Sequence, residues 1–256
     1  MAICEFHLNQ NNVLEKMTAF TAIVPDDQPG PFPVLYLLHG MTDDHTAWTR
    51  RSNVERYVQG LPLIVVMPNG ERGFYTDARN KPRSAFETNL VKDIVGFVDR
   101  TFRTIPTREG RVTAGLSMGG YGALKLALKY PDLFCAAVSH SGAVDFARRD
   151  FSENSEWDRE WRLILGDNPV GGLDDLFALA PGLDLANPPA LRIDCGTEDF
   201  LIESNRAFTA HLTRLGLPHE YEEHPGGHDW DYWDLHIQDT LKFVGNVLGF
   251  GGDKEL

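Results

Sequence analysis

The chain has 256 residues and a formal net charge of −13, with 24 basic side chains against 37 acidic ones. This balance argues against partners that are bound through clustered Lys and Arg, so we expect no nucleic-acid binding and no membrane association. At 42% hydrophobic and 24% charged residues, the composition predicts a globular chain that forms one α/β domain over residues 1–256.

Targeting and cofactor signals are missing from the sequence. No basic segment and apolar run of a signal peptide stand at the start, and no apolar stretch approaches a membrane span, so a cytoplasmic protein is expected. Cys4, Cys135 and Cys195 are odd in number and scattered, which argues against a disulfide framework or a cysteine-based zinc site. Nucleotide-binding and metalloprotease motifs are also missing, so we predict no cofactor and no metal.

Strands and helices are predicted to alternate along most of the chain. The strand patterns lie at residues 2–8, 14–24, 34–38, 63–67, 111–114, 134–138, 191–195 and 219–223. The helical patterns lie at residues 53–59, 90–98, 120–130, 201–215 and 235–248. After an antiparallel start, this alternation predicts a mostly parallel sheet with helices on both faces. Ligands of such sheets bind at the carboxyl ends of the strands.

One stretch, at about residues 146–189, interrupts the alternation and has no clear strand. We interpret it as a small helical cap over the strand ends. Trp157 and Trp161 lie four residues apart within it, and two interpretations stay open: they line a pocket, or they pack a helix onto the body of the protein.

The pattern G-x-S-x-G occurs at Gly115 to Gly119, between a strand pattern and a helical pattern. A serine at such a tight turn is lifted off the sheet with its hydroxyl exposed, next to the free N–H groups of a helix N-terminus. A side chain in place of either glycine would collide with the neighbouring strand or helix. Ser117 is therefore the predicted nucleophile.

A serine nucleophile needs a base, and the base needs an acid that orients it. For the acid, Asp199 follows the penultimate strand, whereas its rival Asp194 lies within that strand and Glu198 depends on the turn. For the base, His228 follows a glycine turn after the last strand, and His224 competes with it at the strand end. The prediction is Ser117, Asp199 and His228.

Other histidines are given different roles. His140 stands at a strand end, where it could line the pocket, and His39 is interpreted as a structural hydrogen-bonding residue. His224 and His228 have a ligand-like spacing, but they flank a glycine turn rather than lie on a helix, so no metal site is assigned to this pair.

Two backbone N–H groups are expected to hold the negative charge that develops on the substrate oxygen. One belongs to Met118, directly after the serine, and the other to Met41, in the loop after the strand at residues 34–38. Four aromatic residues are further predicted to contact substrate: Trp48, Tyr75, Trp157 and Trp161.

These residues resemble the esterase D group of α/β-hydrolases. The resemblance runs from Leu35-Tyr36-Leu37-Leu38-His39-Gly40 through the serine motif to Gly227-His228-Asp229-Trp230, and Phe74-Tyr75-Thr76-Asp77 is similar to the tributyrin esterase branch. S-formylglutathione hydrolases of this group usually carry His where this chain has Leu116 and Tyr121.

The resemblance implies an α/β-hydrolase fold and a serine carboxylesterase acting on short-chain acyl esters, a small-molecule substrate. Alternatives with the same residues are an S-formylglutathione hydrolase-type thioesterase, a feruloyl or acetyl-carbohydrate esterase, an acyltransferase and, without catalysis, a hydrolase fold reused for binding. A homo-oligomer is a further expectation, because the first strands offer an exposed sheet edge.

Overall fold

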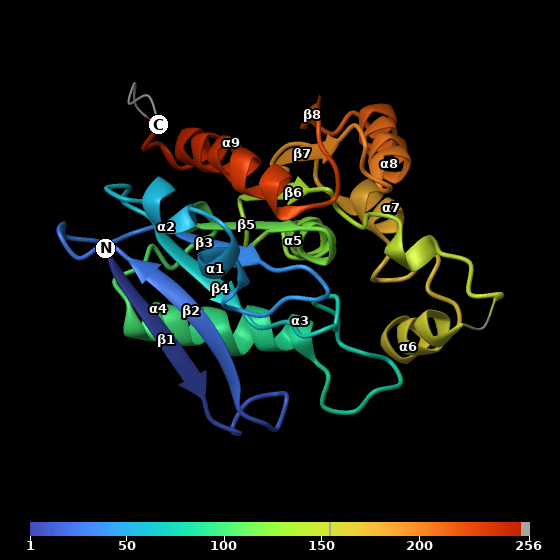
Figure 1. Cartoon of the computed structure of the whole chain (residues 1–256), viewed down its shortest axis with the longest axis horizontal. Coiled ribbons are helices and arrows are strands. Elements are labelled where there is room, and N and C mark those ends of the chain that lie inside the picture. Colours follow the sequence, from blue (N-terminus) through green and yellow to red (C-terminus); the bar gives the residue numbers. More distant parts are fainter. Residues whose placement is uncertain (154, 252–256) are drawn as a thin grey trace.

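The structure is a computed structural model that describes residues 1–153 and 155–251. Within these ranges, eight strands form one sheet in the order β1-β2-β4-β3-β5-β6-β7-β8 (Figure 1). The strands are β1 (Ala2–Leu8), β2 (Thr18–Val24), β3 (Val34–Leu38), β4 (Ile64–Pro68), β5 (Arg111–Leu116), β6 (Ala136–His140), β7 (Ala190–Gly196) and β8 (Glu220–His224). β2 pairs antiparallel with β1 and β4, and the other neighbours are parallel. The predicted mostly parallel sheet with an antiparallel start is confirmed.

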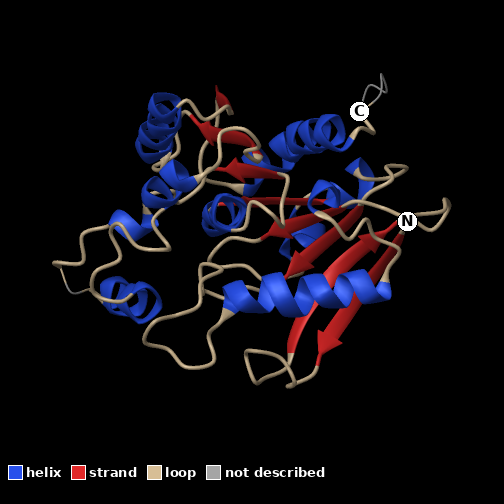
Figure 2. Ribbon diagram, turned by 180° about the vertical axis from the view of Figure 1, so that it is seen from behind, coloured by secondary structure: helices blue, strands red, loops and turns tan. Residues whose placement is uncertain are grey.

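Helices cover both faces of the sheet, as Figure 2 shows. They are α1 (Ala47–Arg51), α2 (Val54–Tyr57), α3 (Phe86–Thr88), α4 (Val95–Thr101), α5 (Met118–Lys129), α6 (Glu156–Leu165), α7 (Leu176–Leu179), α8 (Ile202–Leu215) and α9 (Trp230–Leu248). Side chains of α4, α5 and α8 belong to the hydrophobic core on one face, and those of α1, α2 and α9 to the core on the other. This is the α/β-hydrolase arrangement that the sequence predicted.

The strand β3 shows why a continuous apolar run forms a central strand. Its side chains alternate between the two faces, so that Leu35 and Leu37 enter one core and Tyr36 and Leu38 the other. All five residues of β3 are buried. A strand that is covered on both faces has no polar side, as expected for parallel sheets between helix layers.

Several boundaries differ from the predictions. β2 begins at Thr18 rather than at residue 14, and α9 begins at Trp230 rather than at residue 235. Asp229 explains the longer helix, because its side chain accepts the N–H of Tyr232 and thereby caps the N-terminus. The helix predicted near residue 90 continues from α3 through a π-helical turn, η1 (Asn89–Ile94), into α4. The helix α1 was not predicted.

The described residues between β6 and β7 form no strand, in agreement with the predicted helical stretch. This segment consists of η3 (Phe146–Arg148), α6, α7 and η4 (Ala180–Gly182), and α6 stands apart from the sheet in both views (Figures 1 and 2). Its assignment as a cap stays a prediction. Among the described helices, none is both long and apolar enough to span a bilayer.

Candidate active site

Ser117 stands between β5 and α5 at a sharp turn of the backbone. Its φ of 53° and ψ of −114° lie outside the usual helical and strand regions, and such strain is typical of residues held in place for function. The surrounding chain fixes this conformation, because the N–H of Ser117 donates to the carbonyl of His140 at 2.9 Å and its own carbonyl accepts the N–H of Ala143 at 3.1 Å. The turn is therefore bonded to the end of the adjacent strand β6.

The glycines around Ser117 are required by close backbone packing. A Cβ added to Gly119 would lie 2.4 Å from the carbonyl oxygen of Leu38, and one added to Gly115 would lie 2.6 Å from the carbonyl oxygen of Gly119. Both distances are impossible for a real side chain without moving the backbone. The predicted collision with neighbouring elements therefore accounts for both glycines.

Ser117, His228 and Asp199 form a hydrogen-bonded trio. His228 Nε2 lies 3.0 Å from Ser117 Oγ, and His228 Nδ1 lies 2.8 Å from Asp199 Oδ2. Asp199 is almost completely buried, whereas the His228 side chain keeps 19% of its surface exposed. With Nδ1 protonated toward the carboxylate, Nε2 is left as the acceptor for the serine proton. The structure thus joins the three residues that the sequence singled out.

The charge of Asp199 is maintained in spite of its burial. Desolvation by burial would raise the pKa of this carboxyl, but hydrogen bonds from His228 and from the backbone N–H of Leu201 outweigh it and hold the pKa below its usual value. An ionised carboxylate beside Nδ1 fixes the ring tautomer and stabilises an imidazolium.

The rival acids and bases have other partners. Asp194 Oδ1 lies 2.9 Å from His140 Nδ1 and is fully buried, and His224 Nε2 lies 3.1 Å from a carboxylate oxygen of Glu222. His140 is itself fully buried, so the suggestion that it lines a pocket is wrong.

Glu198, the other candidate acid, accepts the backbone N–H of Gly226 and thereby holds the turn that precedes His228. Its side chain supports the loop of the base instead of contacting the imidazole ring.

The loop after β3 lies against the serine turn. A Cβ on Gly40 would come within 2.7 Å of the Leu116 side chain and 3.9 Å of Ser117 Cβ, so only glycine lets the loop approach this closely. Within the described residues, the N–H groups of Met41 and Met118 have no hydrogen-bond acceptor. Their role as donors to a substrate oxygen stays a prediction.

His39 and Tyr75 fix this loop from beneath. The backbone N–H of His39 donates to Tyr75 Oη at 2.9 Å, and His39 Nε2 accepts the N–H of Gly70 at 2.9 Å. Burial lowers the pKa of His39 to about 4, which keeps the ring neutral and able to accept that bond. These contacts agree with a structural role for His39.

Comparison with known proteins identifies the family of this chain. Residues 12–244 match the family model described as "Putative esterase". An acetyl esterase of Caldicellulosiruptor saccharolyticus is 30% identical over 266 aligned residues, which cover 96% of this chain and 99% of that protein. The chain belongs to this esterase family. It is a carboxylic ester hydrolase, as the sequence predicted.

Two solved structures are similar to this esterase in fold and sequence. The Staphylococcus aureus fluorophosphonate-binding serine hydrolase F superimposes with a TM-score of 0.82 at 28% identity, covering 95% of this chain and 98% of that one. An S-formylglutathione hydrolase of Staphylococcus aureus superimposes with a TM-score of 0.80 at 28% identity, covering 95% and 99%. The comparisons support the esterase family as a whole rather than its tributyrin esterase branch.

The four aromatic residues predicted to contact substrate lie in two different kinds of environment in this esterase. Trp48 and Tyr75 are each only 1% exposed, and Trp48 Nε1 donates to the carbonyl of Leu38, so both support the loop and β3 from inside. The structure does not support substrate contact for these two. Trp161 packs on Phe146, and Trp157 lies under the Arg72 guanidinium. Substrate roles for Trp157 and Trp161 stay predictions.

One residue beside the trio was missed in the sequence. Phe200 follows Asp199 directly, and its ring centroid lies 4.6 Å from that of His228, yet the residue is 73% exposed. A large apolar side chain in the loop after Asp199 was a visible signal, because core packing does not require a phenylalanine in a polar turn.

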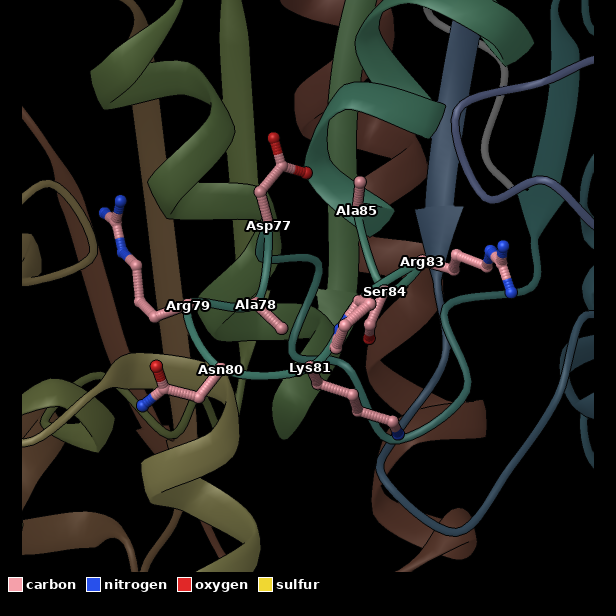
Figure 3. Close-up of a pocket in the computed structure, with 9 residues that line it drawn as sticks. Asp77, Ala78, Arg79, Asn80, Lys81, Arg83, Ser84 and Ala85 are labelled. Carbon is pink, nitrogen blue, oxygen red and sulfur yellow. The ribbon is translucent and has the colours of Figure 1, made fainter.

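The hollow drawn in Figure 3 lies apart from the trio. It has a volume of about 390 Å³ and is lined by residues 77–85, with Arg79 and Arg83 pointing to opposite sides of the loop. The loop itself is bonded to α6, since the N–H groups of Arg79 and Asn80 donate to the carbonyls of Ile164 and Leu163. We interpret the hollow as a consequence of this loop crossing to the helical segment.

Proposed function

We propose that this esterase hydrolyses short-chain acyl esters through an acyl-enzyme formed on Ser117. The observation that supports this proposal most directly is the continuous chain of hydrogen bonds from Ser117 Oγ through His228 to the ionised Asp199. The similarity to an acetyl esterase over almost the full length of both chains supports a small acyl group.

The first half of the reaction forms the acyl-enzyme. Ser117 Oγ attacks the carbonyl carbon of the ester while His228 Nε2 accepts the serine proton, and the carbonyl oxygen becomes negative. The free N–H groups of Met41 and Met118 donate to this oxygen. The carbon–oxygen bond to the alcohol then breaks, and His228 returns its proton to the leaving alkoxide.

Water completes the cycle in a second half-reaction, in which water is the nucleophile and Ser117 is the leaving group. His228 Nε2 accepts a proton from water as its oxygen attacks the acyl carbon, and Ser117 leaves with that proton as the acid is released. Asp199 stays ionised throughout and stabilises the imidazolium.

Thioester hydrolysis is the second candidate, because an S-formylglutathione hydrolase is among the similar structures. The positions where that group usually carries His are occupied by Leu116 and Tyr121, both buried, and Tyr121 Oη donates to the carbonyl of Asp174. Neither residue offers an imidazole beside the serine, so esters remain the favoured substrates.

We also propose that residues 146–189 act as a fixed cap. Phe146 stacks on Phe74 at 3.5 Å between ring centroids, and Arg72 pairs with Glu160 through two hydrogen bonds. These contacts hold the segment against the loop that follows β4, which supports a wall of the site rather than a mobile lid.

The test is hydrolysis of p-nitrophenyl esters from acetate to palmitate by the wild type and by Ser117→Ala. We expect activity that falls beyond the shortest acyl chains and a loss of about 10⁴-fold or more in kcat for the variant. Equal activity of Ser117→Ala on short esters would contradict the proposal. Faster turnover of S-formylglutathione than of every ester would replace it with the second candidate.

A further inference from the structure

Two imidazoles and a carboxylate meet at the junction of β8 and α9, away from the trio. One ligand atom from each of His224, His236 and Asp239 lies within 4.8 Å of the other two. The two imidazole rings are nearly parallel, 4.2 Å apart between centroids, and His236 Nδ1 is 2.9 Å from Asp239 Oδ2. Three side chains with metal-binding chemistry thus converge from a strand and a helix.

The hydrogen bonds of this cluster are incomplete. His236 Nε2 has no hydrogen-bond partner among the described residues, and it is buried in a side chain that is only 8% exposed. An unpartnered buried nitrogen costs free energy. Asp239 contacts the other nitrogen of this ring, Nδ1, so a cation bound by both residues requires the ring or the carboxylate to reorient. On the other side, Glu222 lies 3.1 Å from His224 Nε2 and orients that ring, as carboxylates do behind metal-bound histidines.

We propose that His224, His236 and Asp239 bind one divalent transition-metal ion, for which Zn²⁺ is the natural representative. Two imidazoles and one carboxylate, completed by water, form a donor set that zinc accepts in tetrahedral sites. Ligand atoms of such a site are about 3.3 Å apart, so atoms that lie within 4.8 Å of one another must approach by up to roughly 1.5 Å. One of the two nearly parallel rings must also turn, because the in-plane nitrogen lone pairs of stacked imidazoles do not point at one ion. His224 and Asp239 have room to move, because their side chains are 29% and 42% exposed.

The position of this site gives it a structural consequence. His224 precedes His228 by four residues, and His236 follows it by eight, so the two ligands enclose the turn that carries the imidazole of the trio. That turn contains Gly226 at a φ of 138°, a conformation open to glycine. A metal ion that joins β8 to α9 would restrain this turn without taking part in ester hydrolysis.

The experiment is a calorimetric titration of the full chain, without a histidine tag, with ZnCl₂. We expect one equivalent of Zn²⁺ to bind the wild type, and affinity to fall at least about 10-fold in each of His224→Gln, His236→Gln and Asp239→Asn. Co²⁺ in place of Zn²⁺ should give visible absorption of tetrahedral coordination. At 100-fold excess over Kd, zinc should raise Tm by roughly 5 °C or more in the wild type and by less in the three ligand variants.

Two control variants locate the ion. His7→Gln removes an exposed imidazole on β1, and His228→Gln removes that of the trio; both should bind zinc as the wild type does. The proposal is overturned if the wild type binds no zinc, if His228→Gln abolishes binding, or if His224→Gln and Asp239→Asn leave it unchanged. If His236→Gln fails to fold, the two variants of exposed ligands decide.

Discussion

Lys125 Nζ lies 2.8 Å from Glu87 Oε2, and both side chains are almost completely buried. The same ammonium is 2.7 Å from Thr76 Oγ1 and 3.3 Å from Asp174 Oδ1. The helix that begins directly after Ser117 is therefore bonded to α3, to the loop after β4 and to the segment before α7.

Replacing this lysine tests how much the buried cluster contributes. Lys125→Met leaves the carboxylates of Glu87 and Asp174 buried with less compensation, so the free energy of unfolding should fall by about 3–5 kcal/mol. Urea unfolding measures it. Lys129→Met is the matched control, since Lys129 pairs with the same Glu87 but is partly exposed, and its loss should cost less. Equal losses in both variants would contradict a special role of the buried ammonium.

Glu87 predicts a dependence of stability on acid. Burial alone would raise its pKa, but the charge of Lys125 and hydrogen bonds from Lys125, Lys129 and Tyr130 outweigh it and lower the pKa to about 2. The unfolded chain then binds a proton at a higher pH than the folded one, so this stabilisation is present above about pH 4.5 and is lost as pH falls toward 2.

The free energy of unfolding, measured from pH 6 to pH 2, checks this expectation. Glu87→Gln should be less stable at neutral pH and should lose less stability on acidification than the wild type. Glu15→Gln, at an exposed pair with Arg83, should follow the wild-type curve. A Glu87→Gln curve parallel to that of the wild type would show that the carboxyl does not contribute.

Replacing Asp199 and replacing Asp194 should have different effects, the first on activity and the second on stability. Asp199→Asn should lower kcat by about 10⁴-fold, because an amide beside Nδ1 favours the wrong tautomer of His228. Asp194→Asn disturbs the buried bonds to His140 and to Tyr232 Oη, so it should cost about 1–3 kcal/mol of stability and change kcat much less. Steady-state kinetics and thermal unfolding of both variants check this prediction. Loss of activity in Asp194→Asn rather than in Asp199→Asn would show that Asp194 is the acid.

Phe200 should contribute to the choice of ester. Its exposed ring lies on the His228 imidazole, which protonates the leaving alcohol in the proposed mechanism, so an aryl alcohol can pack against it. Phe200→Ala should lower kcat/KM for phenyl acetate by roughly 2- to 10-fold and leave ethyl acetate nearly unchanged. Stability should stay within about 0.5 kcal/mol of the wild type, since the side chain is exposed. An equal loss for both esters would contradict this selectivity.

The sequence predicted what local pattern determines. Strand ends could be recognised from the apolar run of β3, from the glycines at Gly115 and Gly119, and from the turn residues before Asp199 and His228. The carboxyl ends of parallel strands meet at one edge of the sheet. The trio could be predicted for that reason. The place of Asp194 within its strand also argued against it as the acid, although its partner His140 could not be named from pattern.

What the sequence could not give depends on contacts between distant segments. Lys125 reads as an ordinary helical lysine, because its burial is decided by Glu87 and Asp174, each from another part of the chain. Trp48 and Tyr75 follow strands as pocket residues do, but their exposure is set by how the loops fold over them. Aromatic residues carry the same local signal in a pocket wall and in a core.

The distance along the chain between Ser117 and His228 also determines at which stage of folding the two side chains can first meet. Ser117 and His228 are 111 residues apart, and the contact between them requires β5 to β8 to be aligned and α9 to begin at its place. Contacts between such distant residues form late, since the chain must first close long loops. Under the proposed mechanism, a newly made chain thus carries Ser117 without its base until the segment after the last strand is added, and the serine hydroxyl becomes reactive only when the sheet is complete.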